Sequence, residues 1–273
     1  RHFRAALLAA FSLTWLLPWR AYGDDTPKII RSDYSPYELE TIGLGLRDRI
    51  PTFPAEDAKA VKSAIDDDPD GKMIEAVDVV RFEVFEERDP LPSFPRRVAN
   101  ALHYTSRDQM IRRALLLQTG DLYLTALAEE TARNLRAIGQ ISVALAVPIR
   151  GSAPDRVRWL IVTKDIWSLR LAWDVSATAG GIERLTLNPQ EQNLLGLHHT
   201  LSTKFVYQPL SYSFGAGYAI PRFGNSWIGA STGVGITINT AGQAEGSSGS
   251  LTVGQPLYST RTPWAWSASG TWD

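Results

Sequence analysis

One pentapeptide in the second half of the chain matches a pattern used by serine hydrolases. Residues 229–233 read Gly-Ala-Ser-Thr-Gly, which fits the G-x-S-x-G signature of a nucleophile elbow centred on Ser231. An elbow needs a tight strand-to-helix turn that exposes the serine. Here Val234 to Ile238 continues an alternating apolar pattern, which predicts an unbroken strand. Ser231 is therefore interpreted as a small strand residue.

Two groups of residues could in principle bind a metal ion. Asp66, Asp68, Asp70 and Gly71 match positions 1, 3, 5 and 6 of a calcium-binding EF-hand loop. Position 12 requires a bidentate glutamate and is Val77, where a strand and not a helix is expected. We therefore predict an acidic, solvated turn.

The second group is the pair His198 and His199. Adjacent residues of a strand point to opposite faces, so these two cannot share a metal ion. The chain has no cysteine, which excludes a disulfide framework and a thiolate metal site. We predict that the protein is not an enzyme, with no catalytic, cofactor-binding or metal-binding residue and no cofactor.

The composition changes near Trp167. The net charge of -1 gives no electrostatic basis for binding nucleic acid. Only 10 of the 57 charged residues lie in 167–273, which holds 14 of the 21 glycines and 6 of the 9 tryptophans. Two differently solvated parts are therefore expected to meet there.

The N-terminal region is expected to direct export. Arg1 and Arg4 precede an apolar run over 5–17, and Ala21 and Gly23 fit the small -3 and -1 positions of a cleavage site. A buried helix or membrane anchor is the alternative, but the run is too short to span a bilayer comfortably. We predict a signal peptide over 1–23, followed by a polar, proline-rich and exposed extension over 24–72, in which 36–46 and 55–65 could form short helices.

Residues 73–166 show the order strand, helix, helix, strand, strand. A β-branched strand covers 74–85, and Ser106 to Gln109 reads as a capping box that opens a helix ending near Gly120. A second helix carries an apolar stripe and stops at Gly139, and strands cover 141–149 and 157–163. This order predicts a small α+β unit with both helices on one sheet face.

Residues 167–273 alternate with a period of 2. The clearest runs lie at 169–175, 201–208, 211–220 and 228–239, close to the ~9–11 residues of a tilted membrane strand. Aromatic residues gather near the expected strand ends: Tyr207, Tyr212, Tyr218, Trp227, Tyr258 and Trp264. The pattern predicts six or seven strands of an antiparallel transmembrane β-barrel, incomplete because the chain ends at Asp273 inside an expected strand. A soluble β-sandwich also alternates, but its strands are usually about 5–6 residues long.

The faces of these strands follow from the same alternation. Ile228, Val234, Ile236 and Ile238 are assigned to the lipid side, and Gly233, Gly235 and Thr237 to the lumen. The charged residues expected to face away from lipid in the first strands are Asp174, Glu183, Glu191 and Lys204.

Three sets of motifs resemble the BamA/TamA outer-membrane assembly family. The first is 118–123 (Gln-Thr-Gly-Asp-Leu-Tyr) with 133–136 and 163–168, which resembles a POTRA domain. The second is 191–196 (Glu-Gln-Asn-Leu-Leu-Gly), and the third is 255–259 with 262–265, which resemble barrel segments. The likeness covers about residues 73–273.

The resemblance implies a bacterial outer-membrane protein with its POTRA domain in the periplasm. Because residues 164–167 contain neither Gly nor Pro, we predict that this domain meets the barrel within about five residues after Thr163. Its implied partners are the lipid bilayer, unfolded outer-membrane or secreted polypeptides, and periplasmic proteins. Clients would be assembled or translocated by strand addition at Val77–Val84, at Ile141–Val147, or at the first barrel strand, Ser168–Thr178. BamA and TamA have several POTRA domains, so the single one expected here leaves an insertase role open.

Two other functions remain as alternatives. One is an exporter or porin-like surface barrel without an insertase role. The other is an exported carbohydrate-binding β-protein that uses exposed tryptophans as sugar platforms.

Overall fold

The computed structural model describes residues 34–86, 92, 94, 97 and 103–273. The predicted signal peptide at 1–23 lies outside these residues. The described chain divides into two compact units between Ile166 and Trp167. We call residues 34–166 the helical unit and residues 167–273 the strand unit. Only residues 166–168 separate the last strand of the first unit from the first strand of the second, so the connection is as short as expected.

The helical unit contains the predicted order of strand, helix, helix, strand and strand, preceded by two further helices. Its elements are α1 (Pro36–Arg49), α2 (Ala58–Ala64), β1 (Met73–Phe82), α4 (Asp108–Arg112), α5 (Thr125–Arg136), β2 (Ile141–Arg150) and β3 (Arg156–Asp165). The sheet order is β1-β3-β2, with β1 parallel and β2 antiparallel to β3. The central strand β3 is almost continuously buried, as expected for a strand covered on both faces.

Helices α4 and α5 cover one face of this sheet, as predicted. Ile111 of α4 and Leu127 and Leu135 of α5 pack with Trp159 of β3 in one hydrophobic cluster. Trp159, Ile111 and Leu135 are completely buried, and the ring of Tyr123 meets that of Trp159 edge-on, with 6.3 Å between centroids. This cluster is the main core between the helices and the sheet.

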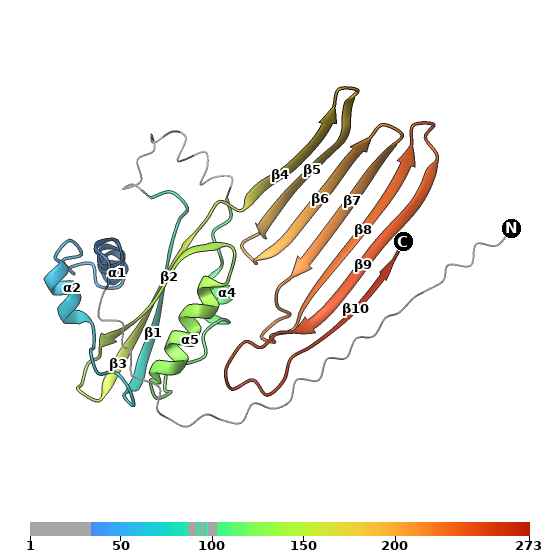
Figure 1. Ribbon diagram of the computed structural model, residues 1–273. Helices are drawn as coiled ribbons and strands as arrows, with labels where there is room; N and C mark the ends of the chain where they lie inside the picture. Colours follow the sequence, from blue (N-terminus) through green and yellow to red (C-terminus); the bar gives the residue numbers. More distant parts are fainter. Residues whose placement is uncertain (1–33, 87–91, 93, 95–96, 98–102) are drawn as a thin grey trace. The chain divides into compact units, whose positions relative to one another are not determined.

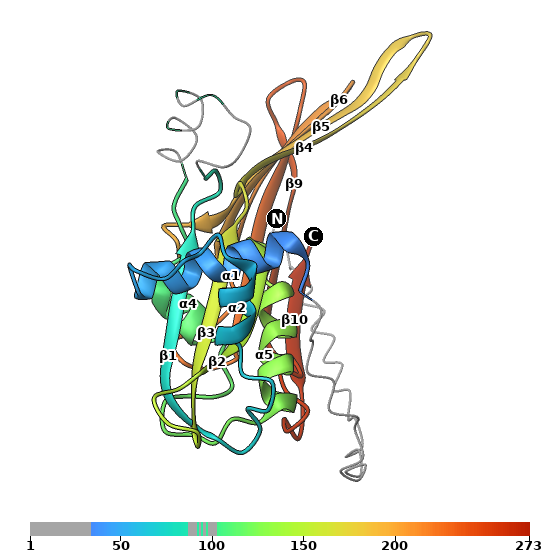
Figure 2. The same ribbon diagram turned by 90° about the vertical axis from the view of Figure 1, so that its left-hand side faces the viewer.

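Helices α1 and α2 cover the opposite face, in front of the strands in Figure 2. Leu39, Ile42 and Leu46 of α1 and Val61 of α2 pack against the sheet in a second hydrophobic cluster. The prediction of an exposed extension is therefore wrong for this segment. The apolar residues of α1 recur with helical spacing, so they form a stripe that the sheet buries.

Local sequence explains where α1 begins and how closely it packs. The hydroxyl of Ser35 accepts a hydrogen bond from the backbone N–H of Glu38 (3.2 Å), and the Glu38 carboxylate accepts one from the backbone N–H of Ser35 (2.8 Å), which completes a capping box. Pro36 occupies the first turn, where no N–H is needed. Further along, Gly43 lies so close to the backbone of Ala55 that a Cβ would overlap it.

The helix predicted after Ser106 differs from the one observed. Helix α4 begins at Asp108, has Arg107 as its N-cap without a side-chain cap bond, and ends at Arg112 instead of near Gly120. The reason is tertiary: the backbone N–H of Ser106 donates to Asp165 (2.6 Å), and its carbonyl accepts from Arg81 (2.6 Å). Ser106 is thereby held by the sheet and does not cap the helix.

The strand unit is a single antiparallel sheet in which each strand pairs with its neighbours in sequence (Figure 1). Its strands are β4 (Leu169–Thr178), β5 (Gly181–Leu194), β6 (His199–Gln208), β7 (Ser211–Ile220), β8 (Gly229–Asn239), β9 (Ala244–Gln255) and β10 (Trp266–Trp272). The sheet order runs from β10 to β4, and these two edge strands do not pair with one another in the described chain. The sheet is therefore open.

Candidate functional site: a two-faced sheet and an open strand edge

One face of the strand unit is lined by large apolar side chains. Residues directly opposite each other in an antiparallel ladder share a face, so the register traces this face across the sheet: Phe205 lies opposite Phe214, and Phe214 opposite Ile236. The main members of the row are Leu169, Leu171, Trp173, Val175, Leu185, Leu187, Leu201, Phe205, Tyr207, Tyr212, Phe214, Val234, Ile236, Ile238, Leu251 and Val253.

Much of this apolar face is exposed. Trp173 is 66% exposed, Leu171 61% and Val234 56%. Such values are too high for the interior of a β-sandwich, whose inner faces pack against a second sheet, and the strand unit has no second sheet among its described residues. The face is a continuous apolar surface and not a scatter of single side chains.

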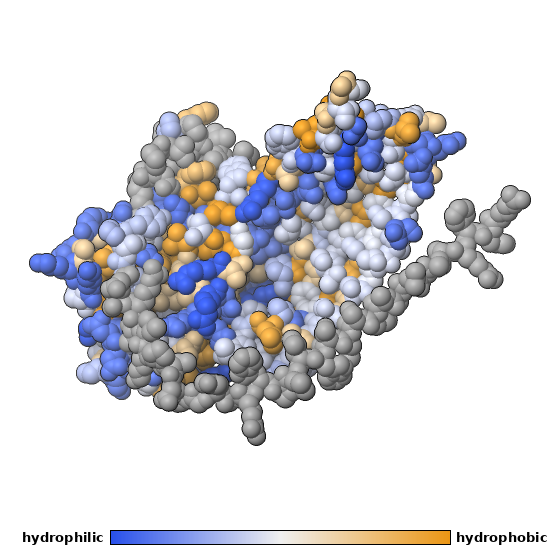
Figure 3. Space-filling view, in the orientation of Figure 1, coloured by the Kyte–Doolittle hydropathy of each residue, from blue (hydrophilic) through white to orange (hydrophobic). Residues whose placement is uncertain are grey.

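The opposite face carries small and hydroxyl-bearing residues. Gly217 lies opposite Gly233, and the hydroxyl groups of Ser213 and Thr237 are 2.9 Å apart. The main members are Ser202, Lys204, Ser213, Gly215, Gly217, Ser231, Gly233, Gly235, Thr237, Ser248, Ser250, Thr252, Ser267 and Ser269. On the side of this unit that Figure 3 shows, a broad pale area marks residues of intermediate hydropathy. The predicted split into a lipid-type face and a polar face is thus present in the register.

The four charged residues assigned to the polar face divide into two groups. Asp174 and Lys204 lie in that face. Glu191 does not, because it pairs with Leu169 and Leu201 in the apolar row. Its carboxylate accepts a hydrogen bond from the backbone N–H of Asn193 (2.8 Å) at the end of the strand. Glu183 is skipped by the pairing where the register shifts, so simple alternation does not place it.

Aromatic residues lie at both ends of the strands. Tyr207 and Tyr212 flank the short β6–β7 turn, with ring centroids 5.7 Å apart. At the other end, Trp227 and Tyr258 stack at 4.2 Å, and the Arg222 guanidinium lies 3.2 Å above the Trp227 ring. Tyrosine and tryptophan favour positions where one end of the side chain is apolar and the other is hydrated.

Ser231 of the G-x-S-x-G pattern lies within β8, where it pairs with Ala219 and Thr252. The strand continues to Asn239, so no strand-to-helix turn is formed here. The predicted strand position is confirmed.

The two histidines are not consecutive strand residues, which corrects the prediction. His198 has a positive φ of 59° in the turn before β6, and its backbone N–H donates to the Asn193 side chain (3.1 Å). His199 begins β6 and lies 2.6 Å from the Tyr218 hydroxyl. Both are held by local hydrogen bonds.

The acidic residues before β1 also have protein partners. Asp66 is buried and accepts from the Lys72 ammonium (2.7 Å) and from the backbone N–H of Asp68 (3.2 Å). Asp70 accepts from the backbone N–H of Thr125 (2.8 Å). Across the residues that the structure describes, no three His, Cys, Asp or Glu side chains are grouped to hold a metal ion. None of the helices in those residues is both long and apolar enough to cross a membrane.

In the helical unit, the outer edge of β1 is covered. Its first residues pair with the segment 120–122: the backbone N–H of Ile74 donates to the Asp121 carbonyl (2.9 Å). Farther along, Arg112 donates to the Val77 carbonyl (3.3 Å), and Arg49 donates to the Val79 carbonyl. Arginine side chains and a loop therefore occupy groups that another strand would need.

The outer edge of β2 is open over its middle. The Pro148 carbonyl points outward, because it accepts from the backbone N–H of Asp66 (2.9 Å). Strand residues alternate in the direction of their backbone groups, so those of Ala146 and Ala144 also point outward. In the described chain β2 pairs only with β3, apart from an isolated bridge between Ile65 and Ile149. Ala144 is buried in the core cluster, whereas Ala146 is partly exposed and lines a groove. The backbone groups of Ala146 are thus the ones available to a further strand.

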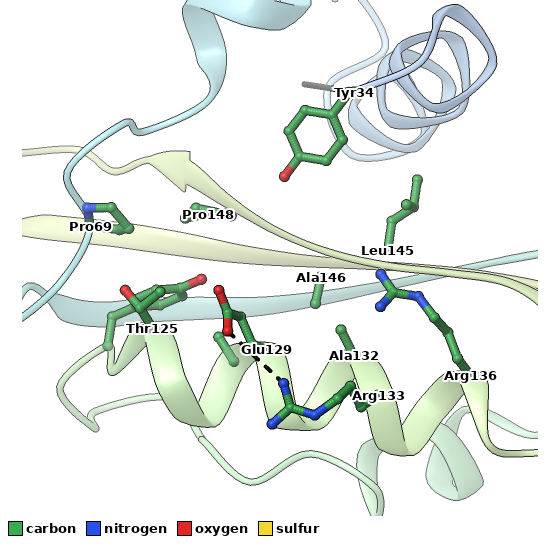
Figure 4. A pocket seen from close by; sticks show the side chains of 12 residues that line it. Tyr34, Pro69, Thr125, Glu129, Ala132, Arg133, Arg136, Leu145, Ala146 and Pro148 are labelled. Atoms are coloured by element: carbon green, nitrogen blue, oxygen red, sulfur yellow. Dashed lines mark ion pairs between the residues drawn. The ribbon is translucent and has the colours of Figure 1, made fainter. Parts of the chain in front are cut away.

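A groove of about 290 Å³ runs beside this open edge, between β2, α5 and Tyr34, which lies two residues before α1 (Figure 4). Leu145, Ala146 and Pro148 line it from the strand. The other lining residues are Tyr34, Pro69, Tyr123, Thr125, Ala128, Glu129, Ala132, Arg133 and Arg136. An extended polypeptide paired with β2 would lie against α5.

A buried polar cluster lies at the C-terminal end of β3. The Asp165 carboxylate lies 3.4 Å from the His103 ring and accepts from the backbone N–H of Ser106. Next to it, Lys164 pairs with Glu86 at 2.9 Å. Because charged groups are costly to bury without partners, these contacts tie 103–106 and Glu86 to β3.

Comparison with solved structures finds similar chains, and two of them illustrate the likeness. BamA from Haemophilus ducreyi lacking POTRA domains 1-3 is 16% identical, with a TM-score of 0.46 over 66% of this chain and 32% of that chain. CdiB from Acinetobacter baumannii is 11% identical, with a TM-score of 0.44 over 90% of this chain and 51% of that chain. This chain therefore spans about a third of the first and about half of the second. No family model and no curated protein matches it.

Proposed function

We propose that this chain is an outer-membrane protein of the BamA/TamA type that assists outer-membrane protein assembly or polypeptide translocation by strand addition. In this proposal the strand unit forms part of a transmembrane β-barrel wall, and the helical unit is a POTRA domain in the periplasm. The observation that carries the proposal is the two-faced sheet, with exposed apolar side chains on one side and glycine, serine and threonine on the other.

This arrangement fits a wall with lipid outside and water inside. Strand β7 has 10 residues, so at about 3.3 Å per residue and a tilt of about 40° it spans about 25 Å. That height matches the apolar band of outer-membrane barrels. The aromatic residues at both strand ends fit the two membrane–water interfaces. A soluble barrel would have its apolar side chains inside.

Strand addition is supported by the edges of the helical unit. A client strand that enters lipid unpaired leaves N–H and C=O groups without water, so a protein edge that satisfies them beforehand lowers the cost of insertion. Of the two edges that the sequence offered in the helical unit, β1 is covered and β2 offers Ala146 beside the groove. We therefore assign client capture to β2.

Cell fractionation tests the membrane proposal. We expect the chain to fractionate with outer membranes and to show heat-modifiable mobility in gels. Recovery as a soluble periplasmic protein would refute the membrane proposal and favour a carbohydrate-binding β-protein. Depletion then separates the two membrane functions. Loss of other barrel proteins supports assembly, whereas loss of a secreted polypeptide alone supports an exporter.

Site-specific photocrosslinking tests strand capture. A benzophenone side chain at Ala146 should crosslink to a urea-unfolded outer-membrane barrel polypeptide presented to the chain in vesicles. The matched control is the same side chain at Val77, on the covered edge of β1. Equal crosslinking at both positions, or crosslinking only at Val77, would contradict capture by β2.

A further inference from the structure

Three polar groups beside the open edge of β2 lack hydrogen-bond or ion-pair partners in the described part of the chain. The hydroxyl of Thr125 is buried and unpaired. Tyr123 is only 3% exposed, and its hydroxyl has no partner among the described residues. The Arg136 guanidinium is exposed and likewise has no ion-pair partner there. Buried polar groups are normally hydrogen-bonded, so the buried Thr125 hydroxyl lacks a partner that a ligand could supply, and the exposed Arg136 guanidinium is a cation that a ligand could pair with.

The charges of the groove favour an anionic group. Glu129 and Arg133 form a pair at 4.0 Å, drawn as a dashed line in Figure 4. Arg136, three residues after Arg133, is the remaining charged residue of the lining, so the groove carries one positive charge that no carboxylate of the lining balances. Figure 4 shows its guanidinium directed toward the groove near Leu145. A carboxylate is the polypeptide group that arginine binds best, through paired hydrogen bonds.

The other end of the groove suits a neutral polar group. Burial raises the pKa of the Tyr123 phenol above its usual range, so its hydroxyl keeps the proton and can donate. Figure 4 places Thr125 near Pro148 and Arg136 near Leu145. A bound strand would therefore meet neutral hydroxyl groups at the Tyr123 and Thr125 end of the groove and a cation at the Arg136 end.

We propose that this groove selects extended polypeptide segments that carry a carboxylate, held by Arg136 while the segment pairs with β2 at Ala146. The inference rests on the proposed function and names its substrate class. The carboxylate can come from an acidic side chain or from a free C-terminus, and both place the same chemistry beside Arg136.

Peptide binding tests this selection. The probes are rhodamine-labelled, C-terminally amidated heptapeptides of alternating threonine and valine with a central glutamate or glutamine. A third peptide keeps the glutamine and has a free C-terminus. Binding to the complete chain in detergent micelles is followed by fluorescence anisotropy. We expect the glutamate peptide to bind about 3- to 10-fold more tightly than the glutamine peptide, the range expected for a partly exposed charge-assisted hydrogen bond.

Two variants and one modified peptide separate the contributions. Arg136→Gln should remove the preference for glutamate, whereas Arg156→Gln, which alters an exposed arginine outside the groove, should retain it. N-methylation of alternate peptide amides should weaken both peptides about 10-fold or more, because it removes donors to the strand edge. A preference shown only by the third peptide assigns the carboxylate to the C-terminus.

The outcomes distinguish the inference from the proposed function. Equal binding of the glutamate peptide, the glutamine peptide and the peptide with a free C-terminus, unchanged by Arg136→Gln, would refute carboxylate selection. If N-methylation still weakened that binding, strand addition would be upheld. Binding that is insensitive to N-methylation, or no binding by any peptide, would refute strand capture at this edge and with it the selection.

Discussion

A single arginine placed on either face of the strand unit tests which side meets lipid. Val234 is the middle residue of β8, half-exposed on the apolar face. Ser248 lies at the same depth, because it pairs with Gly235, the next residue of β8, but it faces the polar side. The two substitutions Val234→Arg and Ser248→Arg therefore place an arginine on opposite faces of the sheet at nearly the same depth along the strands.

The expected magnitudes follow from the environment of each side chain. An arginine facing lipid at the bilayer midplane costs about 2–4 kcal/mol. At about 1.4 kcal/mol per factor of ten, a cost of about 3 kcal/mol lowers the folded population relative to the unfolded one by about two orders of magnitude. At Ser248 the guanidinium stays in water, where surface substitutions change stability by about 0.5 kcal/mol or less. Ser248 is a better control than Gly235, since a Cβ at Gly235 would lie 3.1 Å from the Ser248 hydroxyl.

The assay is a urea titration of the protein folded in phosphatidylcholine vesicles, followed by tryptophan fluorescence. The free energy of unfolding should fall for Val234→Arg and remain near wild type for Ser248→Arg. The reverse order would invert the two faces. The apolar row would then be water-facing, and the membrane interpretation of the strand unit would fail.

Three further predictions concern the helical unit. Gly43→Ala should lower the free energy of unfolding by about 1–3 kcal/mol, because the new methyl group overlaps the Ala55 backbone; an unchanged denaturation midpoint would mean that α1 is not packed there. Asp165→Ala should lower the free energy of unfolding by about 3 kcal/mol, because it leaves buried donors unpaired. Asp165→Asn keeps an acceptor and should lower it less in the same denaturation assay. Equal losses for the two variants would contradict the hydrogen-bonding role of Asp165. Hydrogen bonds from Ser152 lower the pKa of Glu75 below 4.5. Their small, solvent-screened contribution to the free energy of unfolding is therefore present above pH 4.5 and is lost as the pH falls through the lowered pKa. Glu75→Gln should thus narrow the difference in stability between pH 7 and pH 3, as measured by thermal denaturation.

Alternation predicted the strand unit well wherever one face is uniformly apolar, as in β7 and β8. It did not single out β5, whose 14 residues include Asn188, Pro189 and two glutamines. The same strand contains the register shift at Glu183 and ends with Glu191 in the apolar row. A period-2 pattern carries little information where bulges change its phase and strand ends meet polar surroundings.

Tertiary contacts explain the errors in the helical unit. Ser106 looked like a helix cap, but Asp165, almost 60 residues later, holds its N–H. The apolar spacing of Leu39, Ile42 and Leu46 was visible in the sequence and predicts a buried helix face, although prolines nearby favoured an exposed segment. The groove beside β2 had no comparable local signal, because its lining comes from segments separated along the chain.

The covering of β1 has a consequence for how many molecules the helical unit can join. A sheet with two open edges can pair at both and so grow without limit, as fibres do. Here Arg49 and Arg112 occupy the carbonyls of Val79 and Val77, which leaves β2 as the side where pairing can occur. Growth through these edges would therefore stop after one added strand, or at a closed pair of two copies. The two arginines therefore limit the helical unit to one edge that can pair with another strand.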